Sequence, residues 1–245
     1  MTNLYNQMIS RQKEVFTPDE QETLRTSPIV VMGCGGLGGT IIEQLVRSGF
    51  EKITIIDQDV FDETNLNRQV RSNLNSIGKS KVEITKKAME NINPNVEIKG
   101  YDLTVNQNNA EGIFKGNKIL IDAVDNVYTR VMISRIAKKL GITFIHAAVE
   151  KTMGQLSVFS PDSITYEEIF KLKSAGKELN SEVKDYLLSL SVKKPQVLGI
   201  TPSIFGSLQV NETIKVLLDC NDVIYAPKVL MWDISDVSSF RLITF

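Results

Sequence analysis

The strongest constraint on the fold is an apolar run that ends directly in a glycine-rich turn, PIVVMGCGGLGG, over residues 28–39. Gly33, Gly35 and Gly38 have the spacing G-x-G-x-x-G, and a helical pattern follows them. Such glycines let the backbone turn tightly and approach phosphates closely, and the following helix presents unpaired N–H groups to an anion. Asp57 ends the next apolar run, where its carboxylate can accept hydrogen bonds from a ribose. The pattern predicts a nucleotide-binding strand–turn–helix unit.

Short apolar runs and helical patterns alternate along the chain, which favours a parallel sheet with flanking helices. Strands are expected at 28–33, 53–57, 96–100, 118–123, 142–147 and 153–160, and helices near 37–48, 80–92, 127–140 and 201–219. Thr201 is the expected N-cap of the last helix, with Pro202 in its first turn. Gly141 is the expected C-cap of the helix at 127–140.

Residues 161–195 interrupt this alternation, because they are polar, rich in Lys and Ser, and bounded by two prolines. We expect them to cross over the top of the sheet, with a short helix near 181–190. The segments 228–234 and 239–245 are expected to form a C-terminal antiparallel hairpin. The sequence thus predicts one Rossmann-like α/β domain over 1–245, which begins with a helical arm at 1–27.

The composition argues against several classes of protein. A net charge of −1 over 245 residues gives no reason to expect nucleic-acid binding. No apolar run reaches 18 residues and the N-terminus has no signal-peptide pattern, so we expect no membrane span and a cytoplasmic location. The two cysteines, Cys34 and Cys220, fit a reducing compartment and cannot make a four-cysteine zinc site within one chain.

The stretch TNLNRQ (64–69) is unusual for a dinucleotide-binding domain. Attack on a phosphate brings two anions together, and two unit charges about 4 Å apart repel by about 4 kcal/mol at an effective dielectric constant of 20. Arg68 offers a fork of donors that suits phosphate oxygens, and Lys81 can supply a second positive charge. Asn65 and Gln69 can add neutral hydrogen bonds. The stretch therefore predicts a triphosphate site.

Asp125 follows the apolar run KILIDA (118–123), at the sheet edge where open α/β sheets bind ligands. Its carboxylate can hold a Mg²⁺ that bridges phosphates, because hard cations prefer oxygen ligands. Taken singly, Asp125 could be a helix cap, Arg68 a surface arginine and Lys81 a solvated helix end. Their occurrence together at one sheet edge favours the phosphate site.

Together these motifs resemble the ThiF/MoeB/HesA family, the adenylating domain of the ubiquitin-activating-enzyme superfamily. The motifs are G-x-G-G-L-G (33–38), I-D-x-D (56–59), N-L-N-R-Q (65–69), G-K-x-K-V (78–82), I-N-P (92–94), D-A-x-D-N (122–126), G-Q-L-S-V-F (154–159) and G-S-L-Q-x-x-E-x-I-K (206–215). They occur in the family's order and extend over nearly the whole chain.

The resemblance implies ATP·Mg²⁺-dependent adenylation of a carboxylate, which gives an acyl adenylate and pyrophosphate. It assigns the nucleotide-binding roles to Gly33, Gly35, Gly36, Gly38, Asp57, Asp59, Asn65, Arg68, Gln69, Lys81 and Asn126, and the metal to Asp125. Arg11 lies in a stretch that is similar to the family's N-terminal Tyr-x-Arg-Gln, with Ile9 in place of the tyrosine. The resemblance implies that Arg11 reaches into the ATP site of a partner subunit. The implied unit is a homodimer.

The chain departs from the family at its cysteines. The family's first zinc-binding Cys-x-x-Cys pair is replaced by Thr165-Tyr-Glu-Glu168, and the stretch that carries a reactive cysteine in some members reads KKPQVLGITPS (193–203). We therefore expect no zinc and no thioester on this chain, so that a separate acceptor protein must supply the nucleophile. His146, the only histidine, is expected to be a packing or hydrogen-bonding residue at a strand end.

The sequence leaves the carboxylate open. One candidate is the C-terminal glycine of a ubiquitin-like sulfur-carrier protein. The other is a small-molecule carboxylate of a cofactor precursor, such as the pyridinol carboxylate of the [Fe]-hydrogenase guanylylpyridinol cofactor. Two minor alternatives are an NAD-dependent dehydrogenase, which has no use for the phosphate cluster, and a non-catalytic half of a heterodimer, which usually loses it.

Overall fold

Eight strands form one sheet in the computed structural model, which describes residues 2–191 and 196–245. The spatial order is β3-β2-β1-β4-β5-β6-β7-β8, with the first five strands parallel and the remaining pairs antiparallel. The strands are β1 (Ile29–Met32), β2 (Lys52–Asp57), β3 (Glu97–Asp102), β4 (Ile119–Asp122), β5 (Thr143–Glu150), β6 (Met153–Phe159), β7 (Lys228–Asp233) and β8 (Arg241–Thr244). The predicted Rossmann-like sheet and C-terminal hairpin are confirmed.

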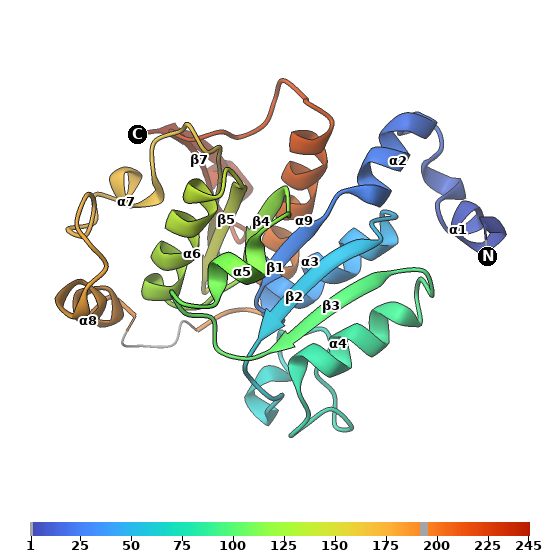
Figure 1. The fold of residues 1–245 in the computed structure, drawn as a ribbon, viewed down its shortest axis with the longest axis horizontal. Coiled ribbons are helices and arrows are strands. Elements are labelled where there is room, and N and C mark those ends of the chain that lie inside the picture. The colour runs from blue at the N-terminus through green and yellow to red at the C-terminus, as the bar shows by residue number, and fades with distance from the viewer. Residues whose placement is uncertain (1, 192–195) are drawn as a thin grey trace.

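The helices cover both faces of this sheet (Figure 1). They are α1 (Thr2–Met8), α2 (Pro18–Thr26), α3 (Gly36–Arg47), α4 (Lys81–Glu90), α5 (Ala110–Phe114), α6 (Val127–Lys139), α7 (Tyr166–Ile169), α8 (Ser181–Ser189) and α9 (Ile200–Leu217). Successive strand residues point to opposite faces, so Val31 packs with α3 and α9, whereas Val30 packs with α6. Burial on both faces explains why β1 is apolar throughout and why β4 is apolar up to its last residue, Asp122.

The site-forming edge follows from the strand order. The chain runs outward from β1 through β2 to β3, and then returns to the other side of β1 to form β4 and β5. The connections after β1 and β4 therefore leave the sheet in opposite directions and open a crevice between them. The glycine turn follows β1 and Asp125 follows β4, so the topology brings these two sequence motifs to one place.

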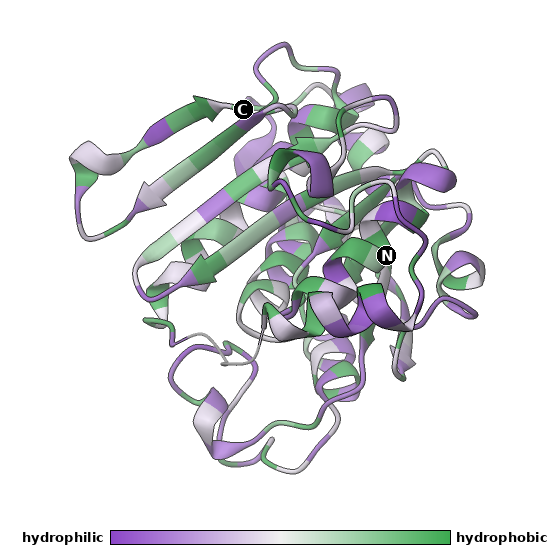
Figure 2. Cartoon of the chain, turned by 90° about the vertical axis from the view of Figure 1, so that its left-hand side faces the viewer, coloured by the Kyte–Doolittle hydropathy of each residue, from purple (hydrophilic) through white to green (hydrophobic). Residues whose placement is uncertain are grey.

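The antiparallel strands continue the sheet beyond β5, with the C-terminal hairpin at the edge (Figure 2). The expected strand at 142–147 extends to Glu150, because β5 pairs with β6 as far as Glu150 and Met153. The prediction that His146 ends a strand was therefore wrong: it lies within β5, opposite Ser157. No helix in the described ranges has the length and hydrophobicity that a membrane crossing requires.

The N-terminal residues dock at the C-terminal end of α3. The Tyr5 hydroxyl donates to the carbonyl of Gly49 at 2.9 Å, and Nε2 of Gln12 donates to the carbonyl of Ser48 at 3.0 Å. Thr17 and Glu20 form a capping box that begins α2.

The crossover segment contains two helices, α7 and α8, of which only α8 was predicted. Thr165 and Glu168, in the stretch that replaces a family cysteine pair, form a capping box that begins α7. Part of the expected crossover, 192–195, lies outside the described residues.

The start of α9 differs from the prediction. The helix begins at Ile200 with Gly199 as N-cap, so the assignment of Thr201 as N-cap was wrong. The Thr201 hydroxyl instead donates to the carbonyl of Lys151 at 2.9 Å, which ties α9 to the β5–β6 turn. A Cβ at Gly199 would lie 2.2 Å from the carbonyl oxygen of Asn67, so the close approach requires glycine. Pro202 lies in the first turn, as predicted. The C-cap of α6 is Leu140, so the assignment of Gly141 as C-cap was one residue too late; Gly141 comes next, with φ of +69°.

Candidate active site

A cavity of about 340 Å³ opens at the crevice between β1 and β4. Eleven of the residues predicted to bind nucleotide or metal line it: Gly33, Gly35, Gly36, Asp57, Asp59, Asn65, Arg68, Gln69, Lys81, Asp125 and Asn126. They come from the ends of β1, β2 and β4, from the TNLNRQ loop and from the first turns of α3 and α4. A volume in this range suits a nucleotide-sized ligand. Gly38 and Arg11 do not line it.

The glycine turn brings α3 close to the sheet. Gly33 has φ of +109°, and a Cβ there would lie 2.6 Å from the carbonyl oxygen of Ala123. Gly38 packs still more tightly, since its Cβ would lie 1.8 Å from the carbonyl oxygen of Gly33. Gly35 and Gly36 form the cavity side of the turn, where the N-terminus of α3 can receive an anion. Gly38 therefore has a packing role, whereas the other glycines face the cavity.

Asp57 lies at the end of β2 and fixes the turn from the other side. Its Oδ2 accepts the N–H of Cys34 at 2.7 Å, and its Oδ1 accepts the N–H of Asp59 at 2.9 Å. Burial raises the pKa of Asp57 above its ordinary value, against the opposing effect of these two hydrogen bonds. Each carboxylate oxygen has a second lone pair, so the side chain can still accept a ribose hydroxyl.

Two of the cations that line the cavity, Lys81 and Arg68, were predicted from the sequence. Lys81 is the first residue of α4, after the N-cap Ser80, and its Nζ lies 3.1 Å from Oδ2 of Asp59. The Lys81 side chain is only 8% exposed, so its charge acts where water screens it poorly. Arg68 is half-buried, and its Nη1 donates to the carbonyl of Thr64 at 2.6 Å. The rest of the Arg68 fork remains available to an anion.

The two amides predicted to bind phosphate differ in their present contacts. Asn65 is buried and already hydrogen-bonded within its own turn, because its amide contacts both the N–H and the carboxylate of Asp62. Gln69 is also buried, yet its Oε1 has no hydrogen-bond partner within the described residues. A buried acceptor without a partner is costly, so Gln69 fits a cavity that is completed by a ligand group with a hydrogen-bond donor, such as a ribose hydroxyl.

The sequence left open whether Asp125 is a helix cap or a metal ligand, and the contacts of Asp125 and Asn126 distinguish these two roles. Asn126 is the N-cap of α6, where its Oδ1 accepts the N–H of Thr129 at 2.8 Å. Asp125 is exposed, and its carboxylate contacts only the Asn126 amide, at 3.5 Å, among the described hydrogen bonds. The capping reading of Asp125 is therefore wrong, and the carboxylate is free to bind a cation.

The acidic and cysteine side chains limit which metal could bind. Within 2–191 and 196–245, no three His, Cys, Asp or Glu side chains cluster as a metal site. A magnesium ion needs no such cluster, since one carboxylate, phosphate oxygens and waters suffice. Asp125 fits this requirement. Cys34 is buried, with its pKa raised well above the ordinary value by burial, and neither Cys34 nor Cys220 lines the cavity.

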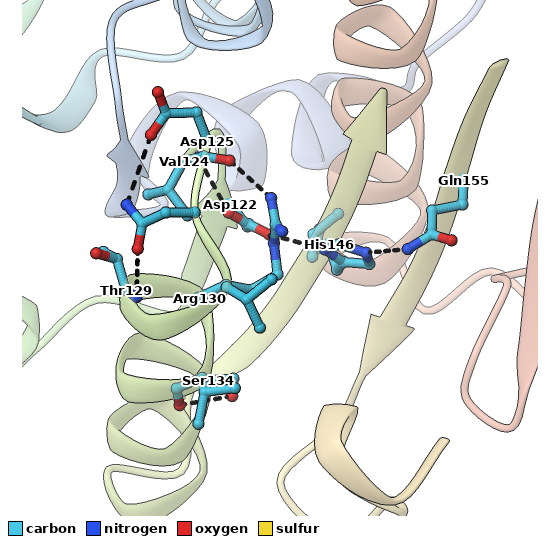
Figure 3. A network of polar contacts seen from close by, with 12 residues as sticks. Asp122, Val124, Asp125, Thr129, Arg130, Ser134, His146 and Gln155 are labelled. Carbon is cyan, nitrogen blue, oxygen red and sulfur yellow. Dashed lines mark hydrogen bonds and ion pairs between the residues drawn. The ribbon is translucent and has the colours of Figure 1, made fainter. Parts of the chain in front are cut away.

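A buried polar network, shown in Figure 3, was missed by the sequence analysis, and one of its members, Arg130, lines the cavity. Arg130 of α6 donates through Nε to Oδ2 of Asp122 at 2.6 Å, and Nδ1 of His146 lies 2.7 Å from the same oxygen. Nε2 of Gln155 lies 3.0 Å from Nε2 of His146. The hydrogen-bonding role expected of His146 is confirmed. The available signal was an aspartate at the end of an apolar strand and an arginine on the apolar side of a helix, which need each other when buried.

The pH dependence of stability follows from the His146 environment. Burial lowers the pKa of His146 below 6.5, and the charge of Arg130 lowers it further, against the opposing effect of Asp122. The unfolded chain therefore binds a proton near pH 6.5 that the folded chain does not, so stability is lost as pH falls through that value. We expect the free energy of unfolding to fall by about 1 kcal/mol more in the parent than in His146→Gln between pH 7 and 5.5. Urea denaturation at both pH values measures this, and equal losses would contradict it.

The structure has a Rossmann-like α/β fold, with a cavity lined by the glycine turn, Arg68, Lys81 and Asp125. The ThiF family model matches residues 9–244, so the chain belongs to the ThiF family. The recognition made from the motifs is thereby confirmed.

Two curated relatives cover most of the chain. One is a "SAMP-activating enzyme E1" from Haloferax volcanii, 28% identical over 90% of this chain and 78% of its own length. The other is a "Sulfur carrier protein adenylyltransferase" from Thermus thermophilus, 29% identical over 93% of this chain and 82% of its own length. Among solved structures, E. coli MccB with ATP superposes with a TM-score of 0.77 at 20% identity, covering 92% of this chain and 65% of that one. This last likeness concerns the fold alone.

Proposed function

We propose that this protein is an ATP-dependent adenylyltransferase that activates a carboxylate as an acyl adenylate and releases pyrophosphate. The observation that carries the proposal is the convergence of Arg68, Gln69, Lys81 and Asp125 on one cavity with the glycine turn. A dehydrogenase would use the turn and Asp57 but would have no use for two cations and a free carboxylate at the phosphate end. The names of the two curated relatives support the same reaction class.

The chemistry requires one bond to form and one to break. A carboxylate oxygen bonds to the α-phosphorus of ATP, and the bond from that phosphorus to the oxygen that bridges to the β-phosphate breaks. Lys81 and Arg68 reduce the repulsion between the two anions, and the N-terminus of α3 stabilises phosphate charge. Magnesium, when bound at Asp125, would neutralise charge on the leaving pyrophosphate. Asp57 would hold the ribose.

The reaction is proposed to end at the acyl adenylate. Cys34 is buried and its thiol is held protonated, and Cys220 lies after α9, outside the cavity lining. A thioester needs an accessible thiolate beside the adenylate. A separate acceptor protein would therefore supply the nucleophile.

The C-terminal glycine of a ubiquitin-like sulfur-carrier protein is the substrate we propose first. The names of the Haloferax and Thermus relatives support it. The alternative is a small-molecule carboxylate such as the pyridinol carboxylate named above, supported by the divergent crossover residues at 161–191. ATP–pyrophosphate exchange, measured with each carboxylate in turn, separates them. Exchange that depends on a carboxylate supports adenylation, and the absence of exchange with every carboxylate would refute it.

We also propose that the working unit is a homodimer with Arg11 acting in the partner's site. Arg11 is exposed and precedes Gln12, which docks at Ser48 beyond the C-terminal end of α3. The 12 residues of α3 span about 18 Å, and the cavity lies at its other end. Arg11 therefore cannot serve its own cavity in this conformation, whereas an isologous dimer could bring it to the other one.

Mixing two inactive variants tests this arrangement. Arg11→Ala and Asp125→Ala protomers, unfolded and refolded together in equal amounts, should recover about a quarter of parental exchange. Half the dimers would be mixed, and each mixed dimer would have one intact site. The same variants refolded separately and then combined provide the control. No recovery after joint refolding would contradict the shared site.

A further inference from the structure

The buried cluster of Asp122, Arg130 and His146 has a hydrogen-bonding order that its geometry fixes. A carboxylate oxygen only accepts, so both Arg130 and Nδ1 of His146 must donate to Oδ2 of Asp122. Nε2 of His146 is then left without a proton and accepts from the Gln155 amide. His146 is consequently neutral in a single tautomer. The cluster holds one positive and one negative charge, both almost fully buried.

The same cluster holds the turn that follows β4. Oδ1 of Asp122 accepts the N–H of Val124 at 3.1 Å, and Nη2 of Arg130 donates to the carbonyl of Val124 at 2.6 Å. Both peptide groups of Val124 are thus held by one ion pair (Figure 3). Asp125 comes next in the chain, with its own carboxylate exposed. The backbone is fixed while the neighbouring side chain stays free for a ligand.

We propose that Arg130 is a positioning residue, held by Asp122, which His146 also contacts, so that it sets where the Asp125 carboxylate meets the metal–triphosphate substrate. This inference rests on the proposed function, because it takes Asp125 as the carboxylate that faces the metal. Apolar residues of similar volume can replace a buried ion pair without loss of stability. Stability alone therefore does not account for a pair whose two members both bind the turn. Arg130 also lines the cavity itself.

Arg130→Lys tests the proposal, with Arg135→Lys as the matched control. Lysine keeps the charge beside Asp122 but lacks the planar fork that reaches the carbonyl of Val124 at the same time. Arg135 lies on the same helix and pairs with Glu167, away from the ATP cavity. For Arg130→Lys we expect a kcat for exchange about a hundredfold lower and a KM for ATP·Mg²⁺ about tenfold higher.

A binding measurement separates positioning from general damage. In EDTA, Arg130→Lys should bind ATP as the parent does, within about twofold, whereas the affinity gained on adding Mg²⁺ should be about tenfold smaller. Arg135→Lys should show the same increase in ATP affinity on adding Mg²⁺ as the parent. Parental magnesium dependence in a folded Arg130→Lys would overturn the proposal. A parent that catalyses no exchange would instead refute the proposed function, while the magnesium dependence of binding could still be read.

The single histidine gives a test that needs no variant. Nitrogen-15 NMR of the parent should show neutral His146 with its proton on Nδ1. Addition of ATP with Mg²⁺ should shift the imidazole signals. Metal binding at Asp125 should displace the neighbouring backbone of Val124, and this changes the positions of Arg130 and of Asp122, which contacts His146. ATP in EDTA should leave them unchanged. The other tautomer, or signals that do not respond to ATP·Mg²⁺ under conditions where calorimetry shows binding, would overturn the proposal.

Discussion

Replacement of Asp125 by alanine is expected to lower ATP–pyrophosphate exchange by about a thousandfold or more, since charge stabilisation by a bound metal contributes several kcal/mol. Asp125 is exposed, and its carboxylate makes one long contact among the described residues, so the fold should be unaffected. The free energy of unfolding should therefore stay within about 0.5 kcal/mol of the parent. Steady-state exchange assays and urea denaturation measure the two quantities.

Asp102→Ala is the matched control for this variant. Asp102 is an exposed carboxylate at the end of β3, opposite Asp57 in the sheet register, but it does not line the cavity. Exchange by Asp102→Ala should match the parent. If Asp125→Ala exchanged at the parental rate, the assignment of the metal to this carboxylate would be wrong.

The second large effect is expected on stability. In Gly38→Ala the new Cβ would lie 1.8 Å from the carbonyl oxygen of Gly33, which is backbone and cannot swing aside. This clash can be removed only if α3 moves away from β1. We therefore expect the free energy of unfolding to fall by about 3 kcal/mol or more, above the usual range for overpacking. A loss of this size is a large part of the stability of a typical domain. The unfolding free energy or the soluble yield measures it.

Gly112→Ala provides the comparison. Gly112 lies in α5, and a Cβ there would have no neighbour within 4 Å. Alanine in a helix is favoured over glycine by about 0.5–1 kcal/mol, so this variant should be neutral or slightly more stable. A Gly38→Ala protein as stable as Gly112→Ala would refute the close helix–strand contact.

The parallel half of the sheet could be predicted from the sequence because its strands are buried on both faces. β1 and β4 are buried at all four positions, so β1 is an unbroken apolar run and β4 is one up to its last residue, Asp122. The cavity could be predicted for a related reason. Functional residues follow strands directly, and the carboxyl ends of parallel strands meet at one edge.

Elements whose formation depends on distant contacts could not be predicted. α5 and α7 have five and four residues, too few to show a helical period. β5 extends to Glu150 because β6 pairs with it. His146 therefore lies in the interior of the strand and not at its end, where it was predicted.

The buried polar network could not be predicted for the same reason, because its contacts join residues that are far apart in the sequence. Asp122 and His146 are 24 residues apart and Gln209 is farther still, yet Nε2 of Gln209 donates to the carbonyl of Asp122 at 2.8 Å. No local pattern records such pairings. The sequence shows only that a buried charge requires a partner, and it does not show which residue provides it.

Calorimetric titration of the purified protein with nucleotides tests the central claim most directly. The cavity is lined by Lys81, Arg68 and Asp125, which are proposed to bind phosphates and magnesium, so we expect that ATP with Mg²⁺ binds and that NAD does not compete with it. Uptake of NAD by a protein that does not bind ATP·Mg²⁺ would contradict the account.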